Sequence, residues 1–192
     1  VGGVHRFPGH DLEKAWATTR AVYDRSAIPP LISGDIEGGS LSHYYACPVP
    51  NQLGMAAADD LDLSRRVARL VAQESRAMGF NWTLSPVVDI DTNFRNPVVG
   101  TRAYGSDVDT ILAQASVLIE ELQANGVAAT AKHWPGDGVD DRDQHLVTTV
   151  NTLPMDVWEA GYGRIYRSLI ERGVMAVMSA HIALPSYILA ED

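Results

Sequence analysis

The stretch GVAATAKHWPGDGVDDRDQH, residues 126–145, joins an apolar segment directly to a run of titratable side chains. Its first part, GVAATAK at 126–132, is mostly apolar and does not alternate between apolar and polar positions. A strand that is apolar on both faces is typical of a parallel sheet covered by helices on each side. The stretch therefore predicts a buried parallel strand that ends at a strongly polar loop.

Similar apolar, β-rich segments recur at 1–7, 30–35, 81–90 and 173–181. Between the segments, apolar residues repeat at i, i+3, i+4 and i+7, which is the spacing of one helix face. These stripes cover 12–23, 63–78, 111–122 and 158–169. The alternation predicts an α/β fold with a parallel sheet, either doubly wound or a (β/α)-barrel. Neither a G-x-G-x-x-G motif nor a P-loop is present to favour a nucleotide-binding fold.

The composition limits the classes of partner. The 192 residues carry a formal net charge of −9, which argues against a nucleic-acid partner, because such proteins present a basic face. No apolar run approaches the roughly 20 residues that a membrane span needs. The single cysteine, Cys47, excludes an internal disulfide and is expected to be buried. No linker or low-complexity tract interrupts residues 1–192, which predicts one domain.

Polar side chains gather where the predicted strands end. The carboxyl ends of parallel strands meet at one edge of a sheet, where α/β proteins bind ligands and barrels carry their catalytic loops. Four strands in succession place ionisable groups there, so the sequence predicts a site at this edge. The residues concerned are Asp35, Glu37, Asp89, Asp91, Lys132, His133 and His181.

The loop after residue 132 contains a candidate acid/base pair. Asp143 precedes His145 by two residues, a spacing that lets the carboxylate accept a hydrogen bond from the imidazole. Such a bond fixes the tautomer and raises the basicity of the ring, which suits proton transfer near neutral pH. If Lys132 points into the site, it can hold a sugar hydroxyl or a carboxylate, and His133 can donate a hydrogen bond.

The same loop also offers a metal-site alternative. Its spacing matches neither a zinc-binding H-x-x-x-H helix nor an EF-hand loop, and Lys132 adds a neighbouring positive charge. We therefore expect no metal and no cofactor, and we interpret residues 137 and 140–142 as solvated loop charges. The alternative ligands are His133, Asp137, Asp140, Asp141, Asp143 and His145.

Four blocks of the sequence, covering roughly residues 30–185, resemble glycoside hydrolase family three in the order of that family. KHWPGDGVDDRDQH resembles its K-H-F-P-G-x-G and D-x-H signature, which marks the β-N-acetylglucosaminidase branch. SGDIEGG resembles D-x-E-G-G, FNWTLSPVVDIDTNFRNPVVGTRAYGSD resembles A-P-V-x-D through G-x-D, and VMSAHIALP resembles the next strand. The resemblance implies a (β/α)8 TIM-barrel-type catalytic domain that hydrolyses terminal β-linked N-acetylglucosamine, or a related β-glycoside, with retention by double displacement.

The resemblance also implies roles for individual residues. His145 would be the general acid/base and Asp143 its partner, whereas most glycosidases use two carboxylates. The role of His181 stays open between packing and contact. The substrate-binding residues implied are Asp35, Arg102, Lys132 and His133.

Two features depart from the family pattern. Ser40 stands where the family has an arginine after D-x-E-G-G. The nucleophilic aspartate of the family would follow one strand beyond Ile188, so we expect it to be missing from this chain. Five strands are expected where a closed barrel takes about eight. The chain is therefore expected to be part of one catalytic domain, with little activity alone, that pairs with a second copy or with the rest of the barrel.

Two other functions remain open at this point. One is a metal-dependent hydrolase on the same barrel, and the other is a non-catalytic remnant that keeps only the sugar subsite. The expected partner is a carbohydrate substrate. Localisation stays open, because a shortened N-terminus would hide a signal peptide. Of the possible compartments, the cytoplasm is slightly favoured.

Overall fold

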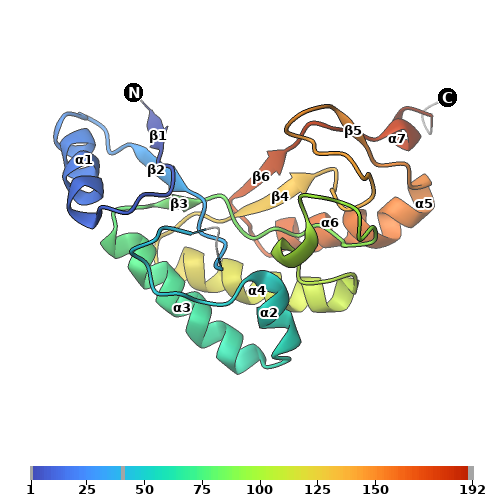
Figure 1. The fold of residues 1–192 in the computed structure, drawn as a ribbon, viewed down its shortest axis with the longest axis horizontal. Coiled ribbons are helices and arrows are strands. Elements are labelled where there is room, and N and C mark those ends of the chain that lie inside the picture. The colour runs from blue at the N-terminus through green and yellow to red at the C-terminus, as the bar shows by residue number, and fades with distance from the viewer. Residues whose placement is uncertain (1, 40–41, 190–192) are drawn as a thin grey trace.

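Five parallel strands form the centre of the protein in the computed structural model, which describes residues 2–39 and 42–189 (Figure 1). Strand β1 pairs with β2, β2 with β3, and β4 with β6. Isolated bridges from Trp82 to Ala128 and from Val87 to Lys132 join the β3 segment to the β4 segment. The strand order is therefore β1-β2-β3-β4-β6. The strands are β1 (Gly3–His5), β2 (Leu31–Gly34), β3 (Trp82–Thr83), β4 (Thr130–Trp134) and β6 (Ala176–Ser179).

Helices follow the strands and cover the sheet, with α3 packed along α4 and α4 against α6 (Figure 1). Several begin at an aspartate that caps a free backbone N–H, as Asp60 does for α3 and Asp107 for α4. The helices are α1 (Leu12–Asp24), α2 (Gln52–Ala57), α3 (Leu61–Ala77), η1 (Gly100–Arg102), α4 (Val108–Ala124), α5 (Met155–Trp158), η2 (Glu159–Gly163), α6 (Arg164–Glu171) and α7 (Pro185–Leu189). The four helices predicted from apolar stripes are confirmed.

The core lies between the sheet and helices α3, α4 and α6. Val127, Ala129 and Ala131 of the β4 segment are fully buried, as are Leu122 of α4 and Leu169 of α6. Small residues on the strand let the helices approach closely, and each large buried aliphatic side chain contributes about 1.5–3 kcal/mol by leaving water. This packing fixes the position of the carboxyl end of β4.

The fold is α/β and of the TIM-barrel type, as predicted. Each of the five parallel strands is followed by a helix, which corresponds to five of the eight units of a (β/α)8 barrel. In the part of the chain that the structure describes, β1 and β6 each pair with a single strand of this sheet. No helix within 2–39 and 42–189 is long and apolar enough to cross a membrane.

Two features of the fold differ from the sequence expectations. A small parallel ladder joins β5 (Thr149–Val150) to β7 (Ile182–Ala183), so the loop after β4 is tied to the loop after β6. It was missed because two-residue strands carry no periodicity. Cys47 was expected to be buried and is exposed, because it lies in an irregular loop at the surface.

Candidate active site

A cleft of about 510 Å³ opens at the carboxyl ends of the strands, as the sequence predicted for this edge. Side chains within or directly after β2, β4 and β6 line it, together with a side chain from η1. Of the six residues singled out from the sequence, Asp35, Arg102, Lys132, His133 and His145 line the cleft. The sixth, Asp143, contacts His145 from outside the lining.

A compact cluster of opposite charges forms the floor of the cleft. The Lys132 Nζ lies 3.0 Å from Oδ1 of Asp35 and 2.6 Å from Oε1 of Glu37. Arg102 donates two hydrogen bonds to the carboxylate of Glu37, at 2.8 and 2.9 Å. Two cations thus meet two carboxylates, so the cluster has no net charge. Multiple hydrogen bonds of this kind are what makes burial of an ion pair tolerable.

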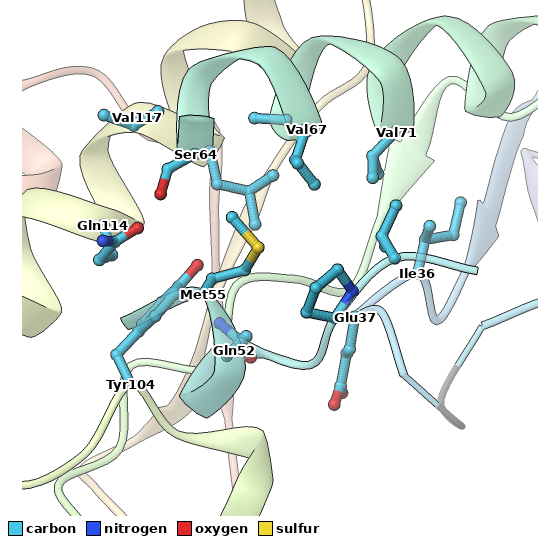
Figure 2. A pocket seen from close by; sticks show the side chains of 14 residues that line it. Ile36, Glu37, Gln52, Met55, Ser64, Val67, Val71, Tyr104, Gln114 and Val117 are labelled. Atoms are coloured by element: carbon cyan, nitrogen blue, oxygen red, sulfur yellow. The ribbon is translucent and has the colours of Figure 1, made fainter. Parts of the chain in front are cut away.

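Glu37 is the buried centre of the cluster, with a side chain only 3% exposed. Burial by itself would raise its pKa, but the hydrogen bonds from Arg102 and the charge of Lys132 outweigh burial and hold the pKa below its usual range. Glu37 also borders a small pocket of about 40 Å³ next to Met55 and Tyr104 (Figure 2). Glu37 thus lines both this pocket and the cleft.

Asp35 differs from Glu37 in its exposure. Its side chain is 33% exposed, and its second oxygen lies 3.6 Å from Nε2 of His5. One oxygen is held by Lys132, and the carboxylate still reaches solvent. Asp35 is therefore a carboxylate that is already oriented and can still accept hydrogen bonds from a ligand.

His133 is held by a fully buried carboxylate. Oδ2 of Asp89 lies 2.6 Å from Nδ1 of His133, and Oδ1 accepts the backbone N–H of His133 at 3.2 Å. Because an ionised carboxylate only accepts, Nδ1 carries the proton and Nε2 is left for the cleft. Asp89 also accepts the N–H of Asp137 at 2.8 Å, so it fixes the strand end and the start of the next loop together.

Lys132 and His133 are neighbours, yet both line the cleft. In a regular strand, successive side chains point to opposite faces. The pairing of β4 with β6 shifts register between Ala131 and Trp134, which is the place where the two residues lie. Irregularities of this kind re-aim side chains beside active sites.

Asp143 and His145 lie in the loop after β4 and contact one another as their spacing predicts. Oδ1 of Asp143 lies 2.6 Å from Nδ1 of His145 and accepts the backbone N–H of His145 at 2.8 Å. The backbone N–H of His145, followed by the imidazole, holds the pKa of Asp143 below its usual range. The His145 side chain is 63% exposed, so its Nε2 is open to a substrate or to water.

Two glycines let the loop leave the strand. Both have positive φ, 122° at Gly136 and 102° at Gly138. A Cβ on Gly136 would lie 2.2 Å from the ring of Tyr162, and one on Gly138 would lie 2.1 Å from the carbonyl oxygen of Ile90. The loop therefore runs tightly against the segment after β3 and against η2.

The interpretation of residues 137 and 140–142 as solvated charges is wrong for Asp137. Its side chain is buried and accepts hydrogen bonds from Asn96 at 2.8 Å, Gln144 at 2.7 Å and the N–H of Gly138 at 2.7 Å. Three donors replace water, so the charge is tolerated inside the protein. Asp140 is also mostly buried, whereas Asp141 and Arg142 are exposed.

Four polar residues that organise the site were not among the catalytic and substrate-binding residues predicted from the sequence: Glu37, Asp89, Asp137 and Gln144. Glu37 and Asp89 carried a signal, because each follows a strand. The other two carried none, because their partners are set by the path of the loop. His181 lines the cleft, and its backbone N–H donates to Oε1 of Gln144 at 3.3 Å. Ser40 lies outside the described residues.

The metal-site alternative gains no support from the geometry. Within 2–39 and 42–189, no group of three or more histidine, cysteine, aspartate or glutamate side chains is arranged to hold a metal ion. Asp143 holds His145, and His133 is held by Asp89, which is not one of the candidate ligands.

A parallel sheet covered by helices, with a polar cleft at the carboxyl ends of its strands, is the arrangement of an α/β-barrel protein. The family model described as the glycosyl hydrolase family 3 N terminal domain matches residues 1–188. The chain belongs to this family.

The chain is also similar to a curated relative and to two proteins of known structure, all of which are described as acting on β-glucosides or β-N-acetylglucosaminides. The chain is 45% identical to a β-N-acetylglucosaminidase/β-glucosidase from Cellulomonas fimi, over 90% of this chain and 31% of that protein. Among solved structures, it matches the β-glucoside phosphorylase BglX with 39% identity and a TM-score of 0.90, over 96% of this chain and 34% of that one. It also matches a family 3 β-N-acetylglucosaminidase from Paenibacillus sp. str. FPU-7, with 31% identity and a TM-score of 0.92, over 97% and 37%. The chain thus spans about a third of the length of these three proteins.

Proposed function

We propose that this chain supplies the sugar subsite and the proton-transfer pair of a retaining glycosidase that acts on terminal β-linked N-acetylglucosamine or a related β-glycoside. The observation that carries the proposal is the single cleft that holds both an oriented charge cluster and the Asp143-supported His145. Membership of glycosyl hydrolase family 3 supports the same reaction class.

The charge cluster is suited to hold the hydroxyl groups of a sugar. Asp35 and Nε2 of His133 can accept hydrogen bonds from hydroxyl groups, while Lys132 and Arg102 can donate to ring and hydroxyl oxygens. Because the cluster is formed by internal ion pairs, its side chains need little reordering when a ligand arrives, which limits the entropic cost of binding. Its net neutrality suits an uncharged substrate.

His145 is proposed to transfer the proton at the leaving-group oxygen and then to accept one from the attacking water. The Asp143 carboxylate keeps the proton on Nδ1, so Nε2 is the nitrogen that exchanges protons. A neutral imidazole takes a proton without adding a second negative charge beside the nucleophile. No residue of this chain is assigned as the nucleophile, so binding and proton transfer are the steps proposed for its own side chains.

Transfer of the sugar to phosphate is a second candidate reaction. The structure of a β-glucoside phosphorylase superimposes on this chain with a TM-score of 0.90, and the two are 39% identical. A phosphate dianion is repelled by a carboxylate base at close range but not by a neutral imidazole. Arg102 and Lys132 on the same cleft add donors for an anion.

The proposal is tested first by binding. Calorimetry of the purified chain with N-acetylglucosamine is expected to show saturable binding that Asp35→Ala weakens at least tenfold and His145→Ala leaves within about twofold. Asp24→Ala, an exposed aspartate of α1, is the control. Equal affinity in the Asp35→Ala variant would contradict the assignment of the subsite.

Turnover is tested separately with 4-nitrophenyl N-acetyl-β-glucosaminide and 4-nitrophenyl β-glucoside, with and without inorganic phosphate. The chain alone is expected to show little turnover. Substantial turnover that His145→Ala abolishes would contradict the view that no residue of this chain is the nucleophile. Formation of a sugar 1-phosphate, seen by ³¹P NMR, would favour the phosphate reaction over hydrolysis.

A further inference from the structure

Gln144 lies between Asp143 and His145 and differs from both in its burial. Of residues 141–148, all of which the structure describes, only Gln144 is buried, and 145–148 are exposed. A polar side chain is costly to bury unless its amide is hydrogen-bonded on both sides. The hydrogen bonds of the Gln144 amide therefore indicate why this side chain is buried.

The amide of Gln144 joins three segments of the protein. Its Nε2 donates to Oδ2 of Asp137 at 2.7 Å, and its Oε1 accepts the backbone N–H of His181 at 3.3 Å. Asp137 belongs to the loop just after β4, and His181 follows β6. The two contacts agree on one orientation of the amide, because a carboxylate accepts and a backbone N–H donates.

The Asp137 carboxylate, which accepts the hydrogen bond from Gln144, is also fixed in place. Oδ1 of Asp137 accepts from Nδ2 of Asn96 at 2.8 Å and from the N–H of Gly138 at 2.7 Å, which leaves Oδ2 for Gln144. The Asp137 backbone N–H is held by Asp89 at 2.8 Å. Gln144 is thus attached to the same buried network that orients His133.

Few other hydrogen bonds hold this part of the loop. Asp143 and His145 bond to each other, and Leu146 and Val147 bond back to the carbonyl of Asp143. Arg142 bonds to Asp140, directly before the segment. Beyond that contact, the hydrogen bonds in the described structure that connect 141–148 to the rest of the protein are the two made by Gln144.

We propose that Gln144 is a positioning residue, whose buried amide holds the Asp143–His145 pair over the cleft by linking the loop to Asp137 and to the end of β6. This inference rests on the proposed role of that pair in proton transfer. Loss of the link frees residues 141–148 as a unit, so His145 leaves its place while the sugar subsite stays intact.

The test uses a substitution that keeps the shape of the side chain and reverses one hydrogen-bonding group. Gln144→Glu puts a carboxylate where the amide nitrogen lay 2.7 Å from Oδ2 of Asp137. Two ionised carboxylates repel each other at this distance, so at pH 7 they are expected to ionise and move apart. The link forms only at lower pH, where the two groups share a proton. ¹⁵N relaxation of the purified chain at pH 7 is expected to show the order parameter of the His145 amide falling from about 0.85 to below about 0.6. Order is expected to return as the pH falls.

A double variant separates hydrogen bonding from packing. In Asp137→Asn/Gln144→Glu, the amide introduced at position 137 can donate to the carboxylate introduced at position 144, while the amide oxygen at 137 still accepts from Asn96 and Gly138. The order of residues 141–148 is therefore expected to return at pH 7. Gln144→Asn, which is uncharged and one methylene shorter, is expected to free the loop at every pH. Thr148→Ala, at an exposed position of the same loop, is the control and is expected to change nothing.

The proposal is overturned if Gln144→Glu keeps wild-type order at pH 7, or if the double variant folds and stays mobile. Should the double variant not fold, wild-type order in Gln144→Asn would overturn it equally. N-acetylglucosamine affinity is measured on the same samples and is expected to stay within about twofold. Failure of the wild-type chain to bind sugar would contradict the proposed function and would leave the order measurements to decide the role of Gln144.

Discussion

The two halves of the cleft are built on opposite physical principles. On one side, Glu37 and Lys132 are almost completely buried and meet in an ion-pair cluster. On the other side, the His145 side chain is 63% exposed and lies on a loop of largely exposed residues. Both halves place an ionisable side chain next to the same space, but only the first is surrounded by the folded core.

The difference shows how order is obtained at each position. A buried cluster is rigid because each charge would be left unpaired if its partner moved, and that cost is large in a medium of low polarity. An exposed pair gains little from its own attraction, because water and salt screen it. Its position must come from something else, and in this chain the buried amide of Gln144 provides the link. In the roles proposed above, sugar binding relies on the core, and proton transfer relies on the hydrogen bonds of Gln144.

The largest effect on stability is expected from Glu37→Gln, which removes a carboxylate from the buried ion-pair cluster. The variant leaves Lys132 with one carboxylate partner, Asp35, and removes the carboxylate with which Arg102 pairs. Removing one member of a buried ion pair costs about 3–5 kcal/mol, so the free energy of unfolding in urea should fall by that amount. The matched control is Glu120→Gln, an exposed glutamate paired with Arg65, for which a change of at most about 1 kcal/mol is expected. Equal losses in the two variants would remove the distinction between buried and exposed pairs.

A smaller effect is expected from Asp89→Asn. Asparagine accepts fewer hydrogen bonds than aspartate, so the contacts to His133 and to the N–H of Asp137 cannot all persist. One buried group left without its partner costs about 1–3 kcal/mol. Affinity for N-acetylglucosamine should fall as well, because His133 loses its fixed tautomer. ¹⁵N spectra of the His133 ring report the tautomer directly.

Asp91→Asn is the control for that prediction. Asp91 lies two residues further along the same segment, and in the described part of the chain its carboxylate forms no hydrogen bond that holds a histidine. Its substitution is expected to change the free energy of unfolding by less than about 0.5 kcal/mol. A His133 ring spectrum unchanged in Asp89→Asn would show that Asp89 does not set the tautomer.

The smallest effect is expected when the pH is lowered, and it concerns the contact between Asp143 and His145. The pKa of Asp143 in the fold lies below its ordinary value of 3.8. Stability from a carboxylate with a lowered pKa is present above the ordinary value and is lost as the pH falls through the folded value. The contact with His145 should therefore persist down to pH 3.8 and break below it. NMR titration of the Asp143 carboxyl carbon measures this midpoint, and a midpoint above 3.8 would contradict the expected direction.

Much of the fold was predictable from local patterns. The helices that became α3 and α4 carry apolar stripes of helical period, and the strand before Lys132 is apolar on both faces, so each element is encoded within its own segment. Part of the site was equally local. Asp143 and His145 are two residues apart, and their contact depends only on that spacing. Their catalytic role stays a prediction.

The rest of the site depends on contacts between distant segments. Nothing near Glu37 in the sequence shows that Arg102 and Lys132 will meet its carboxylate, because the sheet brings the three together. Asp137 looked like a solvated charge for the same reason. Its donors come from Asn96 and Gln144, and they reach it only because two glycines bend the loop inward.

The ladder between β5 and β7 has a consequence for protein engineering. Residues 149–150 and 182–183 hold each other through backbone hydrogen bonds, and the carbonyl of His181 accepts the N–H of Thr149 at 3.1 Å. The loop that carries His145 and the segment after β6 are thus one exchangeable module. Transplanting the loop alone into another barrel would leave half of its anchor behind. A transplant that carries 136–150 together with 179–183 moves both halves.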